Sequence, residues 1–199
     1  MSVAVTLAVR YQSATSAQRL IEQAQNQVIA DVDPEVETLD QTEHNYRKGL
    51  ELVRRSTYGE GGSTLPEAAK WLRQAAEDDH PRAQLMLGVL HENGSGVLQD
   101  YEQALAWYRR AAVQGEAMAM YRVGAMLSHG IGADKDLVEA YAWCNIAAAR
   151  GHREAAIDRK RIAHLLSSEE IKAAQQQSRT VDQEVPYRVA APLILPAGL

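Results

Sequence analysis

Apolar residues recur at helical spacing along most of the chain. Between Ser16 and Ala30 they follow one another three and four positions apart, and the opposite face of that segment is rich in glutamine. Further segments of this kind lie between residues 44 and 183, separated by loops that contain glycine. Residues 1–12 depart from the pattern, because their weak alternation suits either a short strand or an arm. The pattern as a whole predicts an all-α fold.

A period of 36 residues orders these helical segments. Trp71, Trp107 and Trp143 lie at equal intervals of 36 positions. The same offset relates many small and polar residues around the last two tryptophans, among them Ala83 with Ala119, Gly88 with Gly124, Gly94 with Gly130, Asp100 with Asp136, and Gly115 with Gly151. A period of this length is typical of stacked helix–loop–helix units.

The two clearest units resemble Sel1-like repeats, which are relatives of the tetratricopeptide repeat. The motifs that carry the resemblance are Leu/Val-Gly in the first helix, Gly-x-Gly in the loop, and Ala-x-x-Trp and Ala-Ala-x-x-Gly in the second helix. The resemblance extends over residues 44–183. It implies a right-handed α-solenoid that serves as an interaction scaffold and has no shared catalytic residues.

This frame divides the chain into three parts. We expect an N-terminal arm, capping helix and acidic linker over residues 1–43, a repeat domain over 44–183, and a proline-rich apolar tail over 184–199. Within the repeat domain we expect a degenerate repeat at 44–80, full repeats at 81–116 and 117–152, and C-terminal capping helices at 153–183. Two points stay open. The helix at 16–30 either caps the solenoid or joins two protomers, and the tail either docks on its own solenoid or enters a groove on another molecule.

Several polar residues stand where helices are expected to begin. The predicted N-cap residues, with Glu or Gln three positions later, are Thr64, Asp100, Asp136 and Ser167. Asp100 and Asp136 could also be taken for a repeated pair of catalytic carboxylates. Because a capping carboxylate is committed to backbone N–H groups, capping is the better interpretation.

The residues of the chain do not form a catalytic or cofactor-binding pattern. The single Cys144 excludes an intrachain disulfide and aligns with bulky residues in the other units, so we expect a packed thiol. The histidines lack the spacing of a zinc site, and the Gly-x-Gly loops lack the strand and the following lysine of a phosphate-binding loop. The sequence therefore predicts no catalytic residue, no metal and no cofactor, and hence no enzyme.

Charge and hydropathy narrow the possible partners. The net charge is −5 and basic residues are interspersed with acidic ones, which argues against a nucleic-acid partner. No stretch approaches the roughly 18 to 20 apolar residues of a membrane-spanning helix. The first residues have no basic segment followed by a long apolar run, so we expect a cytoplasmic location, or a periplasmic one if an export signal precedes this chain.

The remaining candidate is an interaction surface. In such a solenoid the first helix of each unit lines the concave face, and residues not needed for packing are free to contact a partner. By register the expected contact residues are Arg47, Arg54, Met86, Val89, Glu92, Arg122, Ala125 and His129. We expect a peptide or protein surface as the partner, with a merely solvated face as the alternative. A second hypothesis is a self-associating scaffold, such as a homodimer joined by the tail or the N-terminal helix.

Overall fold

The computed structural model describes residues 34–57 and 64–186. Within these ranges every element is a helix. The helices are α2 (Pro34–Thr57), α3 (Leu65–Glu77), α4 (Pro81–Asn93), α5 (Tyr101–Val113), α6 (Ala117–His129), α7 (Leu137–Ala149), α8 (Arg153–Ala163) and α9 (Ser168–Glu184). The expected helix at 16–30 and the tail beyond residue 186 lie outside the described residues. The all-α prediction is confirmed for the part of the chain that the structure describes.

The expected acidic linker is helical from Pro34 to residue 43, the part of it that the structure describes. Helix α2 begins at Pro34 and includes Glu35 and Glu37 near its start. Proline suits the first position of a helix, and acidic residues favour its positive N-terminal end. The same residues that suggested a solvated connection therefore begin a long helix, and this corrects the expected boundary.

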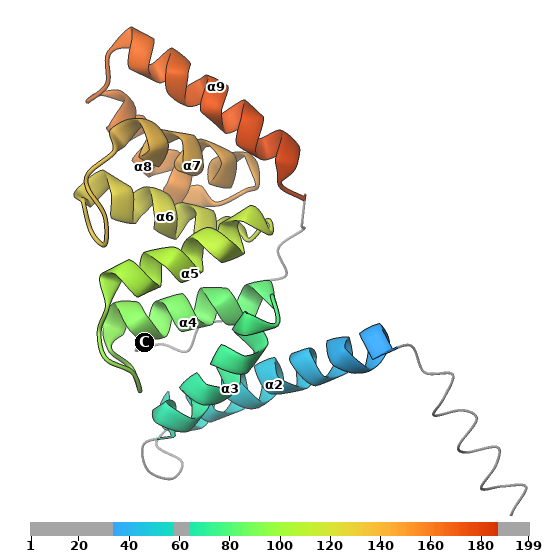
Figure 1. The fold of residues 1–199 in the computed structure, drawn as a ribbon. Coiled ribbons are helices and arrows are strands. Elements are labelled where there is room, and N and C mark those ends of the chain that lie inside the picture. The colour runs from blue at the N-terminus through green and yellow to red at the C-terminus, as the bar shows by residue number, and fades with distance from the viewer. Residues whose placement is uncertain (1–33, 58–63, 187–199) are drawn as a thin grey trace, which may run out of the picture. The chain divides into compact units, whose positions relative to one another are not determined.

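From Thr42 onward the chain forms one compact unit in which neighbouring helices pack in chain order. Helix α3 packs on α4, α4 on α5, α5 on α6, and α6 on α7, while α7 contacts both α8 and α9. Figure 1 shows these helices following one another through the stack, with α9 at its end. The pairs α4/α5 and α6/α7 match the two repeats expected from the 36-residue period. The unit is an all-α solenoid.

Glycine sets the distance between the two helices of each pair. A Cβ atom built on Gly88 would lie 2.5 Å from Cε1 of Tyr108, and one on Gly124 would lie 2.5 Å from Sγ of Cys144. Gly49 holds the same place in α2, where a Cβ would lie 2.6 Å from Cγ of Leu72. No side chain fits at such separations, so each pair requires glycine on its first helix.

The helix ends agree with the sequence in three of four predicted cases. Asp100 and Asp136 each accept a hydrogen bond from a backbone N–H three residues on, at 2.9 Å. Ser167 forms a complete capping box with Glu170. Thr64 also stands at the N-cap position of α3, but its hydroxyl donates to the carbonyl of Leu52 at 2.6 Å and accepts no hydrogen bond from the backbone of α3. A tertiary hydrogen bond to α2 has replaced the local one.

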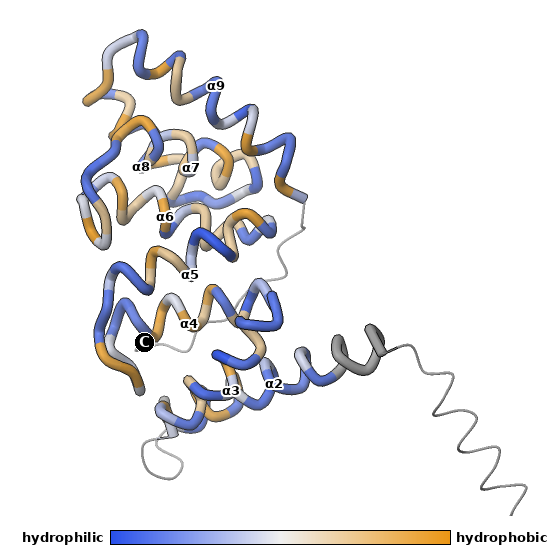
Figure 2. The backbone as a smooth tube through the Cα atoms, viewed as in Figure 1, coloured by the Kyte–Doolittle hydropathy of each residue, from blue (hydrophilic) through white to orange (hydrophobic). Residues whose placement is uncertain are grey.

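The core falls into two clusters that meet at α4. Leu85 and Val89 of this helix belong to the cluster that continues through α5, α6 and α7. Met86, Leu87 and other residues on the opposite side of α4 pack into the cluster formed with α2 and α3. Figure 2 shows that hydrophilic residues dominate α9, the last helix, in keeping with a solvated face at the end of the stack.

Candidate functional site

Two of the expected contact residues are buried. Met86 is 0% exposed and Val89 is 2% exposed, and they belong to the two different core clusters. Helix α4 is buried around most of its circumference because it packs against α3 on one side and α5 on the other. This corrects the expectation that Met86 and Val89 offer their side chains to a partner.

Helix α6, in contrast, has a row of residues that are at least partly exposed to solvent. Its residues Val123, Gly124 and Leu127 are buried, whereas Arg122 and Ala125 are half-buried and His129 is exposed. The outward residues lie three and four positions apart, so they share one face of the helix. We call Glu92, Tyr121, Arg122, Ala125 and His129 the α6 surface, since Glu92 of α4 contacts Arg122 across the helix pair.

The charged groups of the α6 surface are held in place by hydrogen bonds. Nη1 of Arg122 donates to Oε1 of Glu92 at 3.4 Å, and the hydroxyl of Tyr108 donates to Oε2 of the same carboxylate at 2.5 Å. The side chain of Arg122 remains 33% exposed. Burial and the neighbouring Glu92 carboxylate raise the pKa of Tyr108, so its hydroxyl stays protonated and keeps donating. The result is a fixed guanidinium that is still accessible from outside.

An aromatic pair continues this surface toward α8. The rings of Tyr121 and His152 stack with their centroids 4.4 Å apart. Nδ1 of His152 accepts a hydrogen bond from the N–H of Ala155 at 3.3 Å, which requires an unprotonated nitrogen. Burial lowers the pKa of His152, Glu154 opposes this, and the Arg122 charge lowers it further. His152 is therefore a neutral N-cap of α8.

The two arginines expected from the first repeat lie apart from this group. Arg47 pairs with Glu43 at 2.6 Å and Arg54 pairs with Glu51 at 2.9 Å, each within α2. Both arginine side chains are more than half exposed, and exposed pairs of this kind contribute little to stability.

The chemistry-bearing side chains elsewhere have structural roles. Cys144 is fully buried against Gly124, and burial, followed by the charge of Asp158, raises the pKa of its thiol to about 12. A thiol of this kind is a poor nucleophile at neutral pH. Within residues 34–57 and 64–186 no cluster of His, Cys, Asp or Glu is arranged to hold a metal ion.

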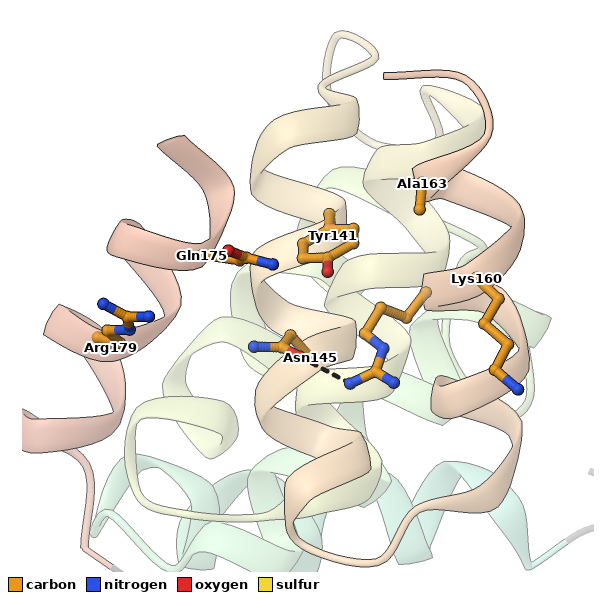
Figure 3. A pocket seen from close by; sticks show the side chains of 7 residues that line it. Tyr141, Asn145, Lys160, Ala163, Gln175 and Arg179 are labelled. Atoms are coloured by element: carbon orange, nitrogen blue, oxygen red, sulfur yellow. Dashed lines mark hydrogen bonds between the residues drawn. The ribbon is translucent and has the colours of Figure 1, made fainter. Parts of the chain in front are cut away.

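A second feature was missed at the sequence level. A cavity of about 510 Å³ lies over α7 between α8 and α9, and the volume is within the range of small-ligand sites. Figure 3 shows the side chains of Tyr141, Asn145, Lys160, Ala163, Gln175 and Arg179 around it, and Arg159 also lines it. The signal was present in the sequence, since Lys160 stands 36 residues after Gly124, where a closely packed helix pair needs glycine.

These features define the protein first as a helical-repeat scaffold. The Sel1 repeat model matches residues 56–80, 81–116 and 117–152. A Sel1 repeat protein from Oxalobacter formigenes is 34% identical, with a TM-score of 0.51, and the match covers 65% of this chain and 98% of that protein. The chain belongs to the Sel1 repeat family, whose members are non-catalytic scaffolds that generally bind other proteins.

A second solved structure shares the fold. A protective antigen present in uropathogenic Escherichia coli strains is 25% identical, with a TM-score of 0.66, over 72% of this chain. The present chain spans 30% of the length of that antigen. No curated protein matches the chain significantly. Among the described residues, none of the helices is long and apolar enough to cross a membrane.

Proposed function

We propose that this protein is a non-enzymatic adaptor that binds a peptide, or the surface of another protein, along the α6 surface. The observation that carries the proposal is the position of Arg122, which donates a hydrogen bond to Glu92 and yet remains one-third exposed, while Tyr108 holds the Glu92 carboxylate in place. Core packing does not require an arginine here. A side chain that is already ordered loses less conformational entropy on binding, and this favours recognition.

The neighbouring residues suit a peptide. Ala125 leaves room beside the guanidinium, and His129 adds an exposed ring one turn further along α6. Tyr121 and His152 provide an aromatic wall on the side of α8. Together these groups offer a charged donor, an apolar gap and stacked rings, which are features that peptide-binding surfaces combine.

The proposal can be tested without knowledge of the partner. Random peptides displayed on phage are selected against the purified full chain, and the enriched peptides are then measured by isothermal titration calorimetry. We expect the variant Arg122→Ala to weaken binding at least about tenfold, or about 1.4 kcal/mol. The matched control is Arg55→Ala, which removes an exposed arginine from the last turn of α2.

Three results contradict the proposal. The first is the absence of any enriched peptide, and the second is equal binding by the wild type and Arg122→Ala. The third is loss of binding on substitution of Lys160 or Arg179 but not of Arg122, because binding then belongs to the cavity between α8 and α9.

The self-associating scaffold remains a second prediction. One observation bears on it, since the first two residues after α9 are docked on their own chain. Val185 is buried in the core, and the guanidinium of Arg150 donates to the carbonyls of Val185 and Pro186 at 3.2 and 2.9 Å. These contacts support a tail that follows its own solenoid, so we place the adaptor first.

A further inference from the structure

The cavity between α8 and α9 exists because the last helix pair does not close. In the preceding pair, Gly124 allows α6 to approach α7 so closely that a Cβ would meet Cys144 Sγ at 2.5 Å. Helix α8 keeps the same register, with Ala155 in the place of Ala119, but Lys160 takes the place of the glycine. A lysine side chain cannot fit at that separation. Helices α8 and α9 instead both pack on α7 and leave about 510 Å³ between them.

The cavity carries positive charge that is not neutralised. Lys160 and Arg179 line it from opposite sides, and neither has an ion-pair or hydrogen-bond partner among the described residues. Arg159 uses one nitrogen, Nη1, to donate to Oδ1 of Asn145 at 2.8 Å, which orients its guanidinium in the cavity wall (Figure 3). No carboxylate is among the lining residues. Nearby Asp158 and Asp182 are engaged elsewhere, in ion pairs with Arg161 and Arg150.

The floor of the cavity adds a directed donor. Tyr141 is 7% exposed and its side chain lines the cavity. Its hydroxyl makes no hydrogen bond with any other described residue. The hydroxyl oxygen is not among the buried polar atoms without a partner, so it is open to the cavity and free to donate to a ligand that accepts a hydrogen bond. The amides of Asn145 and Gln175 complete a lining rich in donors.

We propose that this cavity binds carboxylates of an acidic peptide segment in a partner protein. Arginine and lysine pair with carboxylates through charge-assisted hydrogen bonds, and the Tyr141 hydroxyl can donate to the same group. The cavity volume is large enough for more than one carboxylate, which matches a run of acidic residues better than a single small anion. This site is separate from the α6 surface, and its test is independent of the proposed function.

The experiment measures binding to the full chain by calorimetry. The probe is a polyglutamate hexapeptide with blocked ends, and its neutral counterpart is polyglutamine with blocked ends. Polyglutamine with a free C-terminus distinguishes a chain-terminal carboxylate from side-chain carboxylates, and inorganic phosphate tests a general anion site. We expect polyglutamate to bind, more weakly at higher salt, while blocked polyglutamine does not.

Substitutions then locate the binding site. We expect the double variant Lys160→Gln/Arg179→Gln to weaken polyglutamate binding at least about tenfold, and Tyr141→Phe to weaken it about threefold, in line with the loss of two charge-assisted hydrogen bonds and one neutral one. The charge-matched control is Arg153→Gln/Lys172→Gln, two exposed residues of α8 and α9 that do not line the cavity. Circular dichroism confirms that each variant is folded.

Four outcomes overturn the assignment. They are no measurable binding at millimolar peptide, equal binding of polyglutamate and blocked polyglutamine, unchanged binding by the double variant, and phosphate binding that is tighter than peptide binding. If free-ended polyglutamine binds as well as polyglutamate, the site takes a chain terminus, and the acidic-segment assignment is wrong.

Discussion

At the scale of single residues, equal positions in the repeat are not in equal environments. Trp107 and Trp143 are related by the 36-residue period and both are buried. Nε1 of Trp143 donates to Glu139 at 3.0 Å, whereas Nε1 of Trp107 is buried without a partner among the described residues. The residue four positions earlier is Glu139 in one unit and the exposed Gln103 in the other.

This difference leads to a prediction for a matched pair of variants. Replacing either tryptophan with alanine should cost roughly 3 to 5 kcal/mol as a core truncation. Replacement with phenylalanine should affect the stability of the protein differently at the two positions. Trp143→Phe loses a hydrogen bond and should be about 1 to 3 kcal/mol less stable than Trp107→Phe, which loses only an unpaired donor. Urea unfolding of the two variants measures this, and equal midpoints would contradict it.

His152 provides a prediction on pH. Its folded-state pKa is lowered, mainly by burial, from an ordinary value of 6.5. Below that pH the unfolded chain binds a proton that the folded chain resists, so stability should fall as the pH drops through 6.5 toward the lowered folded pKa. His91, whose pKa burial and Arg73 also lower, should contribute in the same direction.

The variant His152→Asn isolates this effect, because asparagine is a good N-cap that does not titrate. Chemical unfolding at about pH 7.5 and about pH 5.5 should show a smaller loss of stability for His152→Asn than for the wild type. The control is His44→Asn, at an exposed position of α2. The same pH dependence in the wild type and His152→Asn would show that His152 is not held neutral by the fold.

At the scale of helices, the sequence predicts pairing better than exposure. The 36-residue period indicates which helices pair, because Gly88 and Gly124 are required at their contacts. The period does not indicate that α4 packs into a hydrophobic core on both of its sides. That signal lay in the unbroken apolar run from Leu85 to Leu90, which has no polar face and is typical of a fully buried helix. Met86 and Val89 were therefore wrongly expected at a surface.

The tertiary contacts of other elements also escape local patterns. Thr64 has the sequence of an N-cap but donates to Leu52 of the preceding helix, which is twelve residues earlier. The acidic residues from Pro34 onward suit a linker and a helix N-terminus equally, and only the continuation into α2 decides between them. The cavity forms because α8 and α9 both pack on α7. In the sequence, only Lys160 indicates this arrangement.

The need for glycine at the contact between paired helices gives a prediction at this scale. Gly124→Ala places a Cβ against Cys144 and within 3.0 Å of the Ala140 carbonyl. Overpacking of this kind costs about 1 to 3 kcal/mol, which exceeds the gain of up to about 1 kcal/mol in helix propensity. The control is Lys160→Ala, at the equivalent position of the open pair, which should change stability by less than about 0.5 kcal/mol. Thermal unfolding that ranks Gly124→Ala at or above the wild type would contradict this need for glycine.

At the scale of the whole molecule, the solenoid is closed at its C-terminal end by contacts around Arg150. The side chain of Arg150 is 2% exposed and pairs with Asp182 of α9 at 2.9 Å, in addition to the carbonyls that follow this helix. Such a buried arginine with several acceptors fixes the end of α9 against α7. Within the described part of the unit from Thr42 onward, the α6 surface and the cavity both remain open to a partner.

This arrangement predicts the behaviour of a shortened chain. A chain that ends at Pro186 keeps the contacts of Arg150 and Val185, so it should have the same number of protomers per particle as the full chain. Size-exclusion chromatography with light scattering measures both masses. A dimer for the full chain and a monomer for the shortened chain would instead show that the tail joins protomers.

The most direct test of the adaptor hypothesis is site-specific photo-crosslinking in the cells that make the protein. A benzophenone amino acid replaces Ala125 of the α6 surface, and the control carries it at Ala106, an exposed position of α5. The account predicts one crosslinked partner at Ala125, its loss when Arg122→Ala is added, and no such product at Ala106. No product at Ala125, or the same product at both positions, would contradict binding on the α6 surface.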